Sequence, residues 1–305
     1  MINHEVLSVR PKVSVCVVTY NHSKYLAKCL QSIIDQKTSF KFEIIVGEDC
    51  STDDTKEILA DFYSRYPHVI VPIYHSINVG GSENYLAVHK QAVGDYICHV
   101  DGDDYCLPGK LESQASYLDS NHDVNLVWHR MGILSATTGK IKYDNLNKSI
   151  CSKKYTQSEL MKYITIGLHS SVMYRSECRL NHSPSFPVLD YLANVEIIRD
   201  GYASFCNDEV YGVYRAGIGI ASEGGTTKRI MGQTIEYLYE KYPRYKRELS
   251  CASLLILLLL LKSKKYRDLF FMLQINYKLL HVSSFYELLK NKEFILKLKL
   301  PSDSN

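Results

Sequence analysis

Three carboxylates lie within four positions of this chain, at Asp101, Asp103 and Asp104. They follow an apolar run, residues 96–100, whose residue types are typical of a buried strand. Asp101 and Asp103 are two positions apart, so on an extended strand end they point to the same side, and Gly102 lets the backbone approach a ligand. Such oxygen ligands suit Mg²⁺ or Mn²⁺, which keep open positions for phosphate groups. We therefore predict a divalent-metal site with Asp103, Asp101 and Asp104 as ligands; the alternative is a solvated acidic turn.

The first apolar run of the chain, residues 13–18, is continuous and rich in valine, which predicts a buried parallel strand. It ends in Thr19, Tyr20 and Asn21. Polar and aromatic groups at the carboxyl end of such a strand lie where open α/β sheets bind ligands. Asn21 can also cap the following helix, in which Leu26 and Leu30 begin a helical repeat. Both roles are compatible and stay open.

A second strand is predicted at residues 42–46, followed by Glu48 and Asp49. Ser51 and Asp54 have the spacing of a capping box for the next helix, but the two acids precede that box and are not explained by it. Their carboxylates can accept hydrogen bonds from the N–H groups of a nucleobase. We therefore predict that Glu48 and Asp49 line a nucleobase pocket.

The alternation of strand and helix continues through residues 69–73, then Asn78 and Gly80 before a helix from about Ser82, then the strand that ends at the acids. This order predicts an α/β fold with a Rossmann-like, mostly parallel sheet flanked by helices. The carboxyl ends of parallel strands meet at one edge of a sheet. The three polar loops are therefore expected to converge on one rim.

Composition limits the class of protein. With 305 residues, 46% of them hydrophobic and 23% charged, the chain is globular, with room for one large domain and an appendage or for two domains. A net charge of +3 is too small to indicate nucleic-acid binding. Nine cysteines without CxxC spacing argue against a disulfide framework or a zinc site and favour a reducing cytoplasm. The first residues lack the pattern of a signal peptide.

Four motifs, in this order, resemble those of family 2 glycosyltransferases of the GT-A fold, and in particular the bacterial surface-polysaccharide members of the O-antigen and capsule type. They are Val-Val-Thr-Tyr-Asn at 17–21, Glu-Asp-Cys-Ser-Thr-Asp at 48–53, Asn-Val-Gly-Gly at 78–81, and Gly-Asp-Tyr-Ile-Cys-His-Val-Asp-Gly-Asp-Asp at 94–104. The resemblance covers about residues 11–220, and the ordered set is more specific than any single motif.

This resemblance implies an inverting transferase that uses a sugar nucleotide and a divalent metal, Mn²⁺ or Mg²⁺. It implies that the first two loops hold the nucleoside and that the Asp-x-Asp motif carries the metal bound to the diphosphate. Arg215 lies in a Tyr-Arg segment like that of relatives, although Gly217 stands where they often have His. The positions that inherit donor binding are Thr19, Tyr20, Asn21, Glu48, Asp49, Asn78, Gly80, Asp101, Gly102 and Arg215.

Asp190 stands in a region where relatives place a general base at the start of a helix, although Leu189 replaces the usual small or acidic neighbour. An inverting displacement needs a carboxylate that takes the proton of the acceptor hydroxyl. The alternative for Asp190 is a plain helix N-cap, and Glu196 is the nearest rival base. A glycine-rich run up to Gly225 predicts a flexible loop that closes over the donor, or a simple linker.

Between the metal motif and this region we predict a strand at 124–128, a hairpin over 131–143, a capping box from Thr156 to Glu159 and a strand at 169–174. We predict a glycosyltransferase domain at 1–225, with a nucleotide-sugar half at about 11–110 and an acceptor half at about 111–225. Residues 226–305 form a predicted C-terminal helical region.

The C-terminal region contains an uncharged run, residues 249–261, that is shorter than the roughly 20 residues a membrane-spanning helix needs. Lysines outnumber acids beyond it. Basic helices with apolar faces can lie on an anionic membrane surface. The alternative is a soluble helical appendage that packs on the main domain, and both stay open.

These features predict a cytoplasmic glycosyltransferase, peripheral on the inner face of the membrane if its tail docks there. It would move a single hexose from UDP to a lipid-linked saccharide in bacterial polysaccharide biosynthesis. The Gln-x-x-Arg-Trp signature of processive synthases is absent, since Trp128 is the only tryptophan. Two alternatives stay open: a nucleotidyltransferase that makes the sugar nucleotide, although the first loop lacks a glycine-rich phosphate site, and a non-catalytic sugar-nucleotide-binding module.

Overall fold

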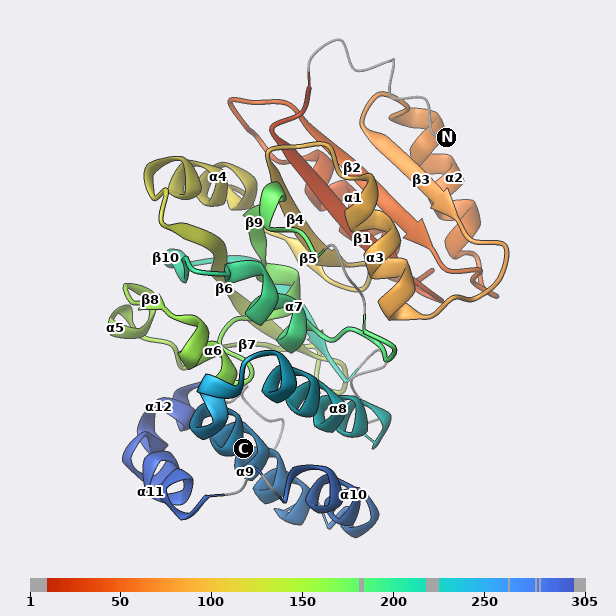
Figure 1. Ribbon diagram of the computed structural model, residues 1–305. Coiled ribbons are helices and arrows are strands. Elements are labelled where there is room, and N and C mark those ends of the chain that lie inside the picture. The colour runs from red at the N-terminus through yellow and green to blue at the C-terminus, as the bar shows by residue number, and fades with distance from the viewer. Residues whose placement is uncertain are drawn as a thin grey trace.

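A computed structural model describes residues 10–180, 184–217, 225–262, 264–277, 279 and 281–298. Its centre is a mixed sheet of ten strands (Figure 1). Four strands at one end are parallel, in the order β3, β2, β1, β4. Their bounds are β1 Val13–Thr19, β2 Phe42–Glu48, β3 Ile70–Tyr74 and β4 Tyr96–Asp101. The predicted strands at the start of the chain are therefore confirmed.

The sheet continues beyond β4 through strands from the second half of the chain. Antiparallel β9 (Met173–Arg175) joins β4 to β6 (Val124–Ser135), and β10 (Tyr202–Ala216) runs parallel to β6. Two short strands, β5 (Tyr105–Cys106) and β8 (Lys154–Tyr155), pair with β10. β7 (Ile141–Tyr143) pairs with the end of β6, which confirms the predicted hairpin.

Helices cover both faces of the sheet, which is why its strands are apolar on both sides. On one face α1 (Leu26–Ile34), α2 (Thr55–Arg65) and α4 (Lys110–Ser120) share a core with Val13, Val15 and Val17. The other face of β1, at Cys16, contacts a second core. The helices of that core include α3 Gly81–Gln91, α5 Lys148–Cys151, α6 Gln157–Tyr163 and α7 Asp190–Ile198.

The C-terminal region is helical, as predicted, and lies at the end of the molecule away from β1–β3 (Figure 1, blue). The second core extends into it, because Leu249, Ile256 and Leu260 are buried there. No helix in the described part of the chain has the length and apolar character needed to cross a bilayer. The helices are α8 Gly225–Lys241, α9 Lys246–Lys262, α10 Tyr266–Asn276, α11 Val282–Lys290 and α12 Lys292–Lys297.

Local details of the prediction have mixed outcomes. The capping box of Thr156 and Glu159 is confirmed at the start of α6. The box of Ser51 and Asp54 is wrong, because α2 has Asp54 as its N-cap without a side-chain bond, and the Ser51 hydroxyl accepts from the amide of Asn21 instead. The strand predicted at 169–174 is shorter, since residues 169–171 form a 3₁₀ turn. Residues 1–9, where no signal peptide is predicted, and most of the predicted loop before Gly225 lie outside the described residues.

Candidate functional site

The carboxyl ends of β1, β2 and β4 lie side by side. Thr19 is in register with Glu48, and Val18 is in register with Asp101. The Gly102 amide also donates to the Val18 carbonyl over 2.8 Å, so the acidic turn is attached to the end of β1. The predicted convergence of three polar loops on one rim is therefore confirmed.

The loops after β1 and β2 are joined by hydrogen bonds. The Asn21 side chain accepts from the Thr52 amide over 2.8 Å, and the Asn21 amide donates to the Ser51 hydroxyl over 3.0 Å. Asn21 has φ +53°, a left-handed conformation that asparagine tolerates better than most residues. Asn21 does not serve as the N-cap of α1, which is Tyr25, and so shapes the rim rather than capping the helix. Tyr20 next to it is 37% exposed.

Gly102 is a position where only glycine fits. A Cβ there would lie 2.9 Å from the Thr19 side chain and 3.0 Å from Nδ1 of His22. Oγ1 of Thr19 and Nδ1 of His22 are both buried and have no hydrogen-bond partner among the described residues. Buried polar atoms without partners are uncommon in proteins, and here two of them flank the acidic turn. They are available to a ligand that enters this rim.

Asp49 organises the third loop of the rim. Its two carboxylate oxygens accept from the amides of Val79 and Gly80, over 2.7 and 2.9 Å, and its carbonyl accepts from the Asn78 side chain over 3.2 Å. Gly80 has φ +87°, which a side chain would disfavour. Asp49 thus holds the loop before α3 in place. Glu48 similarly accepts from the Ser51 amide over 2.7 Å, so both predicted base-binding acids also shape the loops around them.

Two of the three metal-motif acids are engaged by a serine. The Ser170 hydroxyl lies 3.1 Å from Oδ2 of Asp101 and 2.5 Å from Oδ2 of Asp104. The other oxygen of Asp104 accepts from the Arg215 amide over 2.9 Å. In contrast, the carboxylate of Asp103 accepts no hydrogen bond from any other residue that the structure describes. The free lone pairs of the acidic turn therefore belong mainly to Asp103.

The three acids differ in protonation. Burial, and then the charge of Asp101, raise the pKa of Asp103 to about 7. Burial, and then the charges of Asp101 and Asp103, also raise the pKa of Asp104. Burial alone would raise the pKa of Asp101, but hydrogen bonds from His99 and Ser170 outweigh it and lower that pKa. Burial and mutual repulsion thus disfavour the ionisation of all three acids together, and a bound cation would relieve this repulsion.

These acids fit a divalent cation that also needs ligands from a substrate. In the described part of the chain, no three His, Cys, Asp or Glu side chains are arranged as a complete metal site. Mg²⁺ typically binds one or two carboxylates together with phosphate oxygens and water, so a complete protein cage is not required. Asp103 is the first candidate ligand, while Asp101 and Asp104 are held by Ser170. Of the three predicted ligands, Asp101 and Asp104 are already hydrogen-bonded, whereas the Asp103 carboxylate accepts no hydrogen bond from another described residue.

Arg215 brings a cation to the same turn. Its Nε donates to the Asp103 carbonyl over 2.6 Å, and its guanidinium lies 4.8 Å from the Tyr25 ring centroid and 5.5 Å from that of Tyr105. Contact with aromatic faces holds a guanidinium in place and leaves its edge free for anions. The two terminal nitrogens of Arg215 have no acceptor within the ranges described. They are suited to a phosphate group.

Asp190 begins α7 and lies near this turn. Its Oδ1 accepts from the Tyr191 amide over 2.7 Å, but the N-cap is Leu189, so the simple N-cap alternative is wrong in position. The pKa of Tyr214 is raised to about 12 by burial and then by four carboxylates, those of Asp104, Asp101, Asp103 and Asp190. Asp190 and the acidic turn therefore both act on the environment of Tyr214.

The segment before Asp190 is also attached to the donor side of the rim, because the Val188 amide donates to the Ser82 hydroxyl in α3 over 2.7 Å. The rival Glu196 lies within α7, and its carboxylate pairs with Lys241 of α8 over 2.7 Å. Glu196 thus joins α7 to the C-terminal helices. Of the two carboxylates, only Asp190 is free of an ion pair with the described cations.

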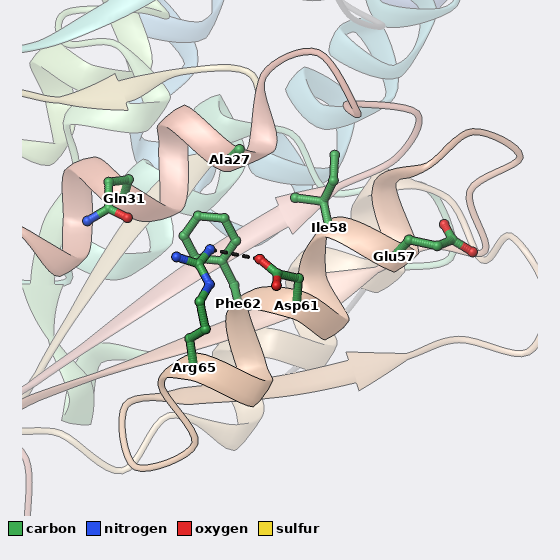
Figure 2. A pocket seen from close by; sticks show the side chains of 7 residues that line it. All are labelled: Ala27, Gln31, Glu57, Ile58, Asp61, Phe62 and Arg65. Carbon is green, nitrogen blue, oxygen red and sulfur yellow. Dashed lines mark ion pairs between the residues drawn. The ribbon is translucent and has the colours of Figure 1, made fainter.

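A surface hollow between α1 and α2 is distinct from this rim (Figure 2). Ala27, Gln31 and Ile58 line it, and Asp61 forms an ion pair with Arg65 over 2.9 Å at its edge. None of its lining residues is one of the predicted site residues. The polar groups that could bind a charged ligand gather at the rim instead.

Several residues of the site had not been predicted. Ser170 lies in a 3₁₀ turn far from the acids in sequence, and no local pattern indicates it. Lys110 is fully buried, and its ammonium donates to the Ser170 carbonyl over 2.8 Å. His99 had a readable signal, because it precedes Asp101 by two positions on a strand and so shares its face.

Comparison with known proteins gives the family. The model of Glycosyl transferase family 2 matches residues 14–178, more than half of the chain. The abequosyltransferase RfbV of Salmonella typhimurium is 35% identical over 115 residues, which are 37% of this chain and 34% of that protein. The chain spans about a third of the length of the first curated relatives that it matches.

Solved structures share the fold at low sequence identity. TarS of Staphylococcus aureus (residues 1–349), in complex with UDP-GlcNAc, has a TM-score of 0.60 and 21% identity over 78% of this chain and 70% of that one. The mannosyltransferase PcManGT of Pyrobaculum calidifontis, in complex with GDP-Man and Mn²⁺, has a TM-score of 0.60 and 15% identity over 95% of this chain and 81% of that one. The predicted α/β fold of GT-A type is confirmed. Because the family match extends over more than half of its length, this chain belongs to glycosyl transferase family 2.

Proposed function

We propose that this protein transfers a single sugar from a nucleotide donor to an acceptor hydroxyl, with inversion at the anomeric carbon. The observation that carries this proposal is the Asp103 carboxylate, which accepts no hydrogen bond from another described residue and lies near the Arg215 guanidinium, while Asp190 acts on the same Tyr214 as the acidic turn. Negative, positive and proton-accepting groups at one rim are what the displacement of a diphosphate by a hydroxyl requires. Family membership supports the same reaction class.

In this proposal the donor lies along the rim. The nucleoside contacts the loops after β1 and β2, and the diphosphate lies near Arg215 and the acidic turn. A bound Mn²⁺ or Mg²⁺ would be held by Asp103, with Asp101 and Asp104 close by, and would supply Lewis-acid stabilisation of the leaving diphosphate. The nucleoside contacts are assigned to Thr19, Tyr20, Asn21, Glu48, Asp49, Asn78 and Gly80, and the phosphate and sugar contacts to Asp101, Gly102 and Arg215.

Asp190 acts as the general base. Its carboxylate takes the proton of the acceptor hydroxyl while the acceptor oxygen forms a bond to the anomeric carbon. The bond from that carbon to the diphosphate oxygen breaks, and the nucleoside diphosphate leaves with the electron pair. Attack opposite to the leaving group converts an α-linked donor into a β-linked product. Tyr214, whose pKa is raised, stays protonated and can donate a hydrogen bond near this carboxylate.

The donor is proposed to be a UDP-hexose, and the acceptor a lipid-linked saccharide in bacterial polysaccharide assembly of the O-antigen or capsule type. Support for UDP comes from the TarS complexes with UDP-GlcNAc and UDP, whose protein shares this fold. The acceptor class is proposed from the resemblance of the four sequence motifs to those of surface-polysaccharide members of the family. Nine free cysteines, most of them buried, favour a reducing compartment and therefore the cytoplasm.

A donor panel tests this proposal. UDP-, GDP- and CDP-sugars are added to the full chain with Mn²⁺ or with EDTA, and thermal unfolding is followed. We expect UDP-hexoses to raise the Tm only when Mn²⁺ is present, because the metal would bridge the acids and the diphosphate. A ligand at 100 times its Kd stabilises the folded state by about 2.7 kcal/mol, which is a measurable shift. Slow release of UDP from the best donor would distinguish an enzyme from a non-catalytic binding module. If no nucleotide sugar shifts the Tm in Mn²⁺, the donor assignment is wrong.

The C-terminal helices are proposed to dock on an anionic membrane surface. On α11, Val282, Phe285, Tyr286 and Leu289 follow the spacing of one helix face and are 52% to 88% exposed. Leu259, Leu261 and Phe270 of α9 and α10 are exposed as well. An exposed apolar stripe of this size on a basic helical region is typical of helices that lie in a membrane interface.

Charges near this stripe favour an anionic surface over a neutral one. Lys262, Lys264, Arg267, Lys290 and Lys292 are all exposed. Two nearby acids are already neutralised, since Asp268 pairs with Arg229 over 3.3 Å and Glu287 with Lys162 over 2.8 Å. Membrane docking and packing on the main domain are therefore compatible, because one side of the C-terminal region packs on the core while the other is exposed.

Substitutions on α11 test the docking, since deletion of the region would expose the core around Leu249. We expect the variant Phe285→Ser/Leu289→Ser to lose most binding to vesicles of phosphatidylglycerol and phosphatidylcholine in a sedimentation assay. The control Tyr63→Ser/Tyr74→Ser removes exposed aromatic residues from the donor half and should bind normally. Salt should weaken wild-type binding, because basic residues contribute about 1 kcal/mol each near an anionic surface. Equal binding to neutral vesicles at high salt would contradict the electrostatic part.

A further inference from the structure

A chain of buried hydrogen bonds leads from the core to the rim carboxylate of Asp101. The Tyr174 hydroxyl lies 2.7 Å from Nδ1 of His89, and Nε2 of His89 lies 3.0 Å from Nδ1 of His99. Nε2 of His99 lies 3.2 Å from Oδ1 of Asp101. We call Tyr174, His89 and His99 the histidine chain. All three side chains are almost fully buried, and the reaction proposed above uses none of them.

Ring packing fixes the two imidazoles in place. The ring centroid of Tyr85 lies 3.8 Å from that of His89, and the centroid of His169 lies 3.9 Å from that of His99. His89 comes from α3 and His99 from β4. The histidine chain therefore also joins the helix that follows the Asn78–Gly80 loop to the strand that ends in the acidic turn. Rotation of either ring would disturb this packing.

The direction of each hydrogen bond follows from the groups at its ends. The ionised Asp101 only accepts, so Nε2 of His99 must carry the hydrogen. His99 is buried and packed against His169, an environment that disfavours a charged ring, and a neutral ring with its hydrogen on Nε2 has a lone pair on Nδ1. Nε2 of His89 must therefore donate to His99. Burial lowers the pKa of His89 as well, and its Nδ1 accepts from the Tyr174 hydroxyl.

We infer that His89 and His99 are positioning residues that hold the Asp101 carboxylate by presenting a single N–H in a fixed tautomer to its Oδ1. The Ser170 hydroxyl lies 3.1 Å from Oδ2 but also 2.5 Å from Oδ2 of Asp104, and it has one hydrogen to share between them. If His99 carried its hydrogen on Nδ1, its Nε2 lone pair would face the carboxylate and repel it. The hydrogen bond from His89 excludes that tautomer. The inference rests on the proposed function, in which Asp101 contacts the donor next to Asp103.

Indirect support of this kind has a measurable effect on ligand binding. Groups that orient a metal ligand or its neighbour typically contribute 10- to 100-fold to metal affinity, although they never touch the ion. His89 acts through His99, so its removal should change the tautomer of a residue that is itself unaltered. A purely structural residue would not do that.

Nitrogen-15 NMR of histidine-labelled protein tests the tautomers directly. In the wild type without ligand, we expect His89 and His99 each to carry hydrogen on Nε2 and a lone pair on Nδ1. The test variant is Tyr174→Phe/His89→Phe. It places a phenyl ring at each position and leaves no buried hydroxyl without a partner. Tyr174→Phe alone is its matched control. His99 should remain in one tautomer in the control, whereas in the double variant only Asp101 selects the Nε2–H form, so a fraction with the hydrogen on Nδ1 should become detectable.

Titration with Mn²⁺ and UDP provides the second measurement. The control should bind within about two-fold of the wild type, and the double variant about 10-fold more weakly. A wild-type His99 with its hydrogen on Nδ1 would overturn the inference without any variant, and so would unchanged affinity in a folded double variant. If the wild type binds no nucleotide with Mn²⁺, the proposed function fails, while the NMR spectra still decide the tautomers.

Discussion

Asp190→Asn is expected to lower kcat for sugar transfer by about 10²- to 10⁴-fold and to leave the donor KM nearly unchanged. Asparagine has the size of aspartate and can still accept from the Tyr191 amide, which lies 2.7 Å from Oδ1 of Asp190. It cannot take a proton from the acceptor hydroxyl. Steady-state kinetics with the donor found in the panel, together with thermal unfolding of both proteins, measures the effect.

The matched control for this prediction is Glu196→Gln in the same helix. It weakens the ion pair with Lys241 and should lower stability while most turnover is retained. If Asp190 served only the helix start, Asp190→Asn would cost about 1 kcal/mol of stability or less and remain active. An inactive Glu196→Gln beside an active Asp190→Asn would move the base to Glu196.

We expect Asp103→Ala to weaken Mn²⁺-dependent binding of UDP by at least about 100-fold, since it removes a direct ligand rather than a supporting group. Asp101→Ala should have a smaller effect, because hydrogen bonds from His99 and Ser170 already engage that carboxylate. Isothermal titration with and without Mn²⁺ measures both. The exposed Asp95→Ala, which removes only an ion pair with Arg10, is the control. Full activity of Asp103→Ala in Mn²⁺ buffer would contradict the assignment.

The same variant has an expected effect on stability without metal. The pKa of Asp103 is about 7 in the folded chain, whereas an unfolded aspartate has a pKa of about 4. Between these values the folded state binds more protons, so the contribution of Asp103 to stability falls as the pH rises through this window. Asp103→Ala removes that loss. Its metal-free Tm, relative to wild type, should therefore increase from about pH 5 to about pH 8.

The rim could be predicted because its causes are local in sequence. The apolar runs that end at Thr19, Glu48 and Asp101 identify buried parallel strands, and the carboxyl ends of such strands meet at one edge. The sequence also carried the cue for His99, through the two-residue repeat of a strand. Glycine at position 102 predicts that the backbone there comes close to another group. In the structure the neighbouring groups are the side chains of Thr19 and His22.

Other parts of the site depend on contacts between distant segments. Ser170 reaches Asp101 and Asp104 only because β9 inserts between β4 and β6, and Arg215 reaches the turn because β10 runs beside β6. No repeat in the sequence indicates the contact made by Ser170 or the one made by Arg215. The capping box at Ser51 failed for a related reason, since a tertiary partner, the Asn21 amide, uses the hydroxyl that local spacing had assigned to the helix.

The insertion of β9 also sets an order of events while the chain is being synthesised. Strands β1 to β4 can pair as soon as about the first hundred residues have left the ribosome, since their contacts are local to that segment. The free side of β4 then waits for residues 173–175, and β5 waits for Gly212 and Val213. Until then the nascent protein presents an apolar strand edge that can pair with another chain. The strand that ends in the acidic turn is therefore an unprotected sheet edge until β9 has been synthesised.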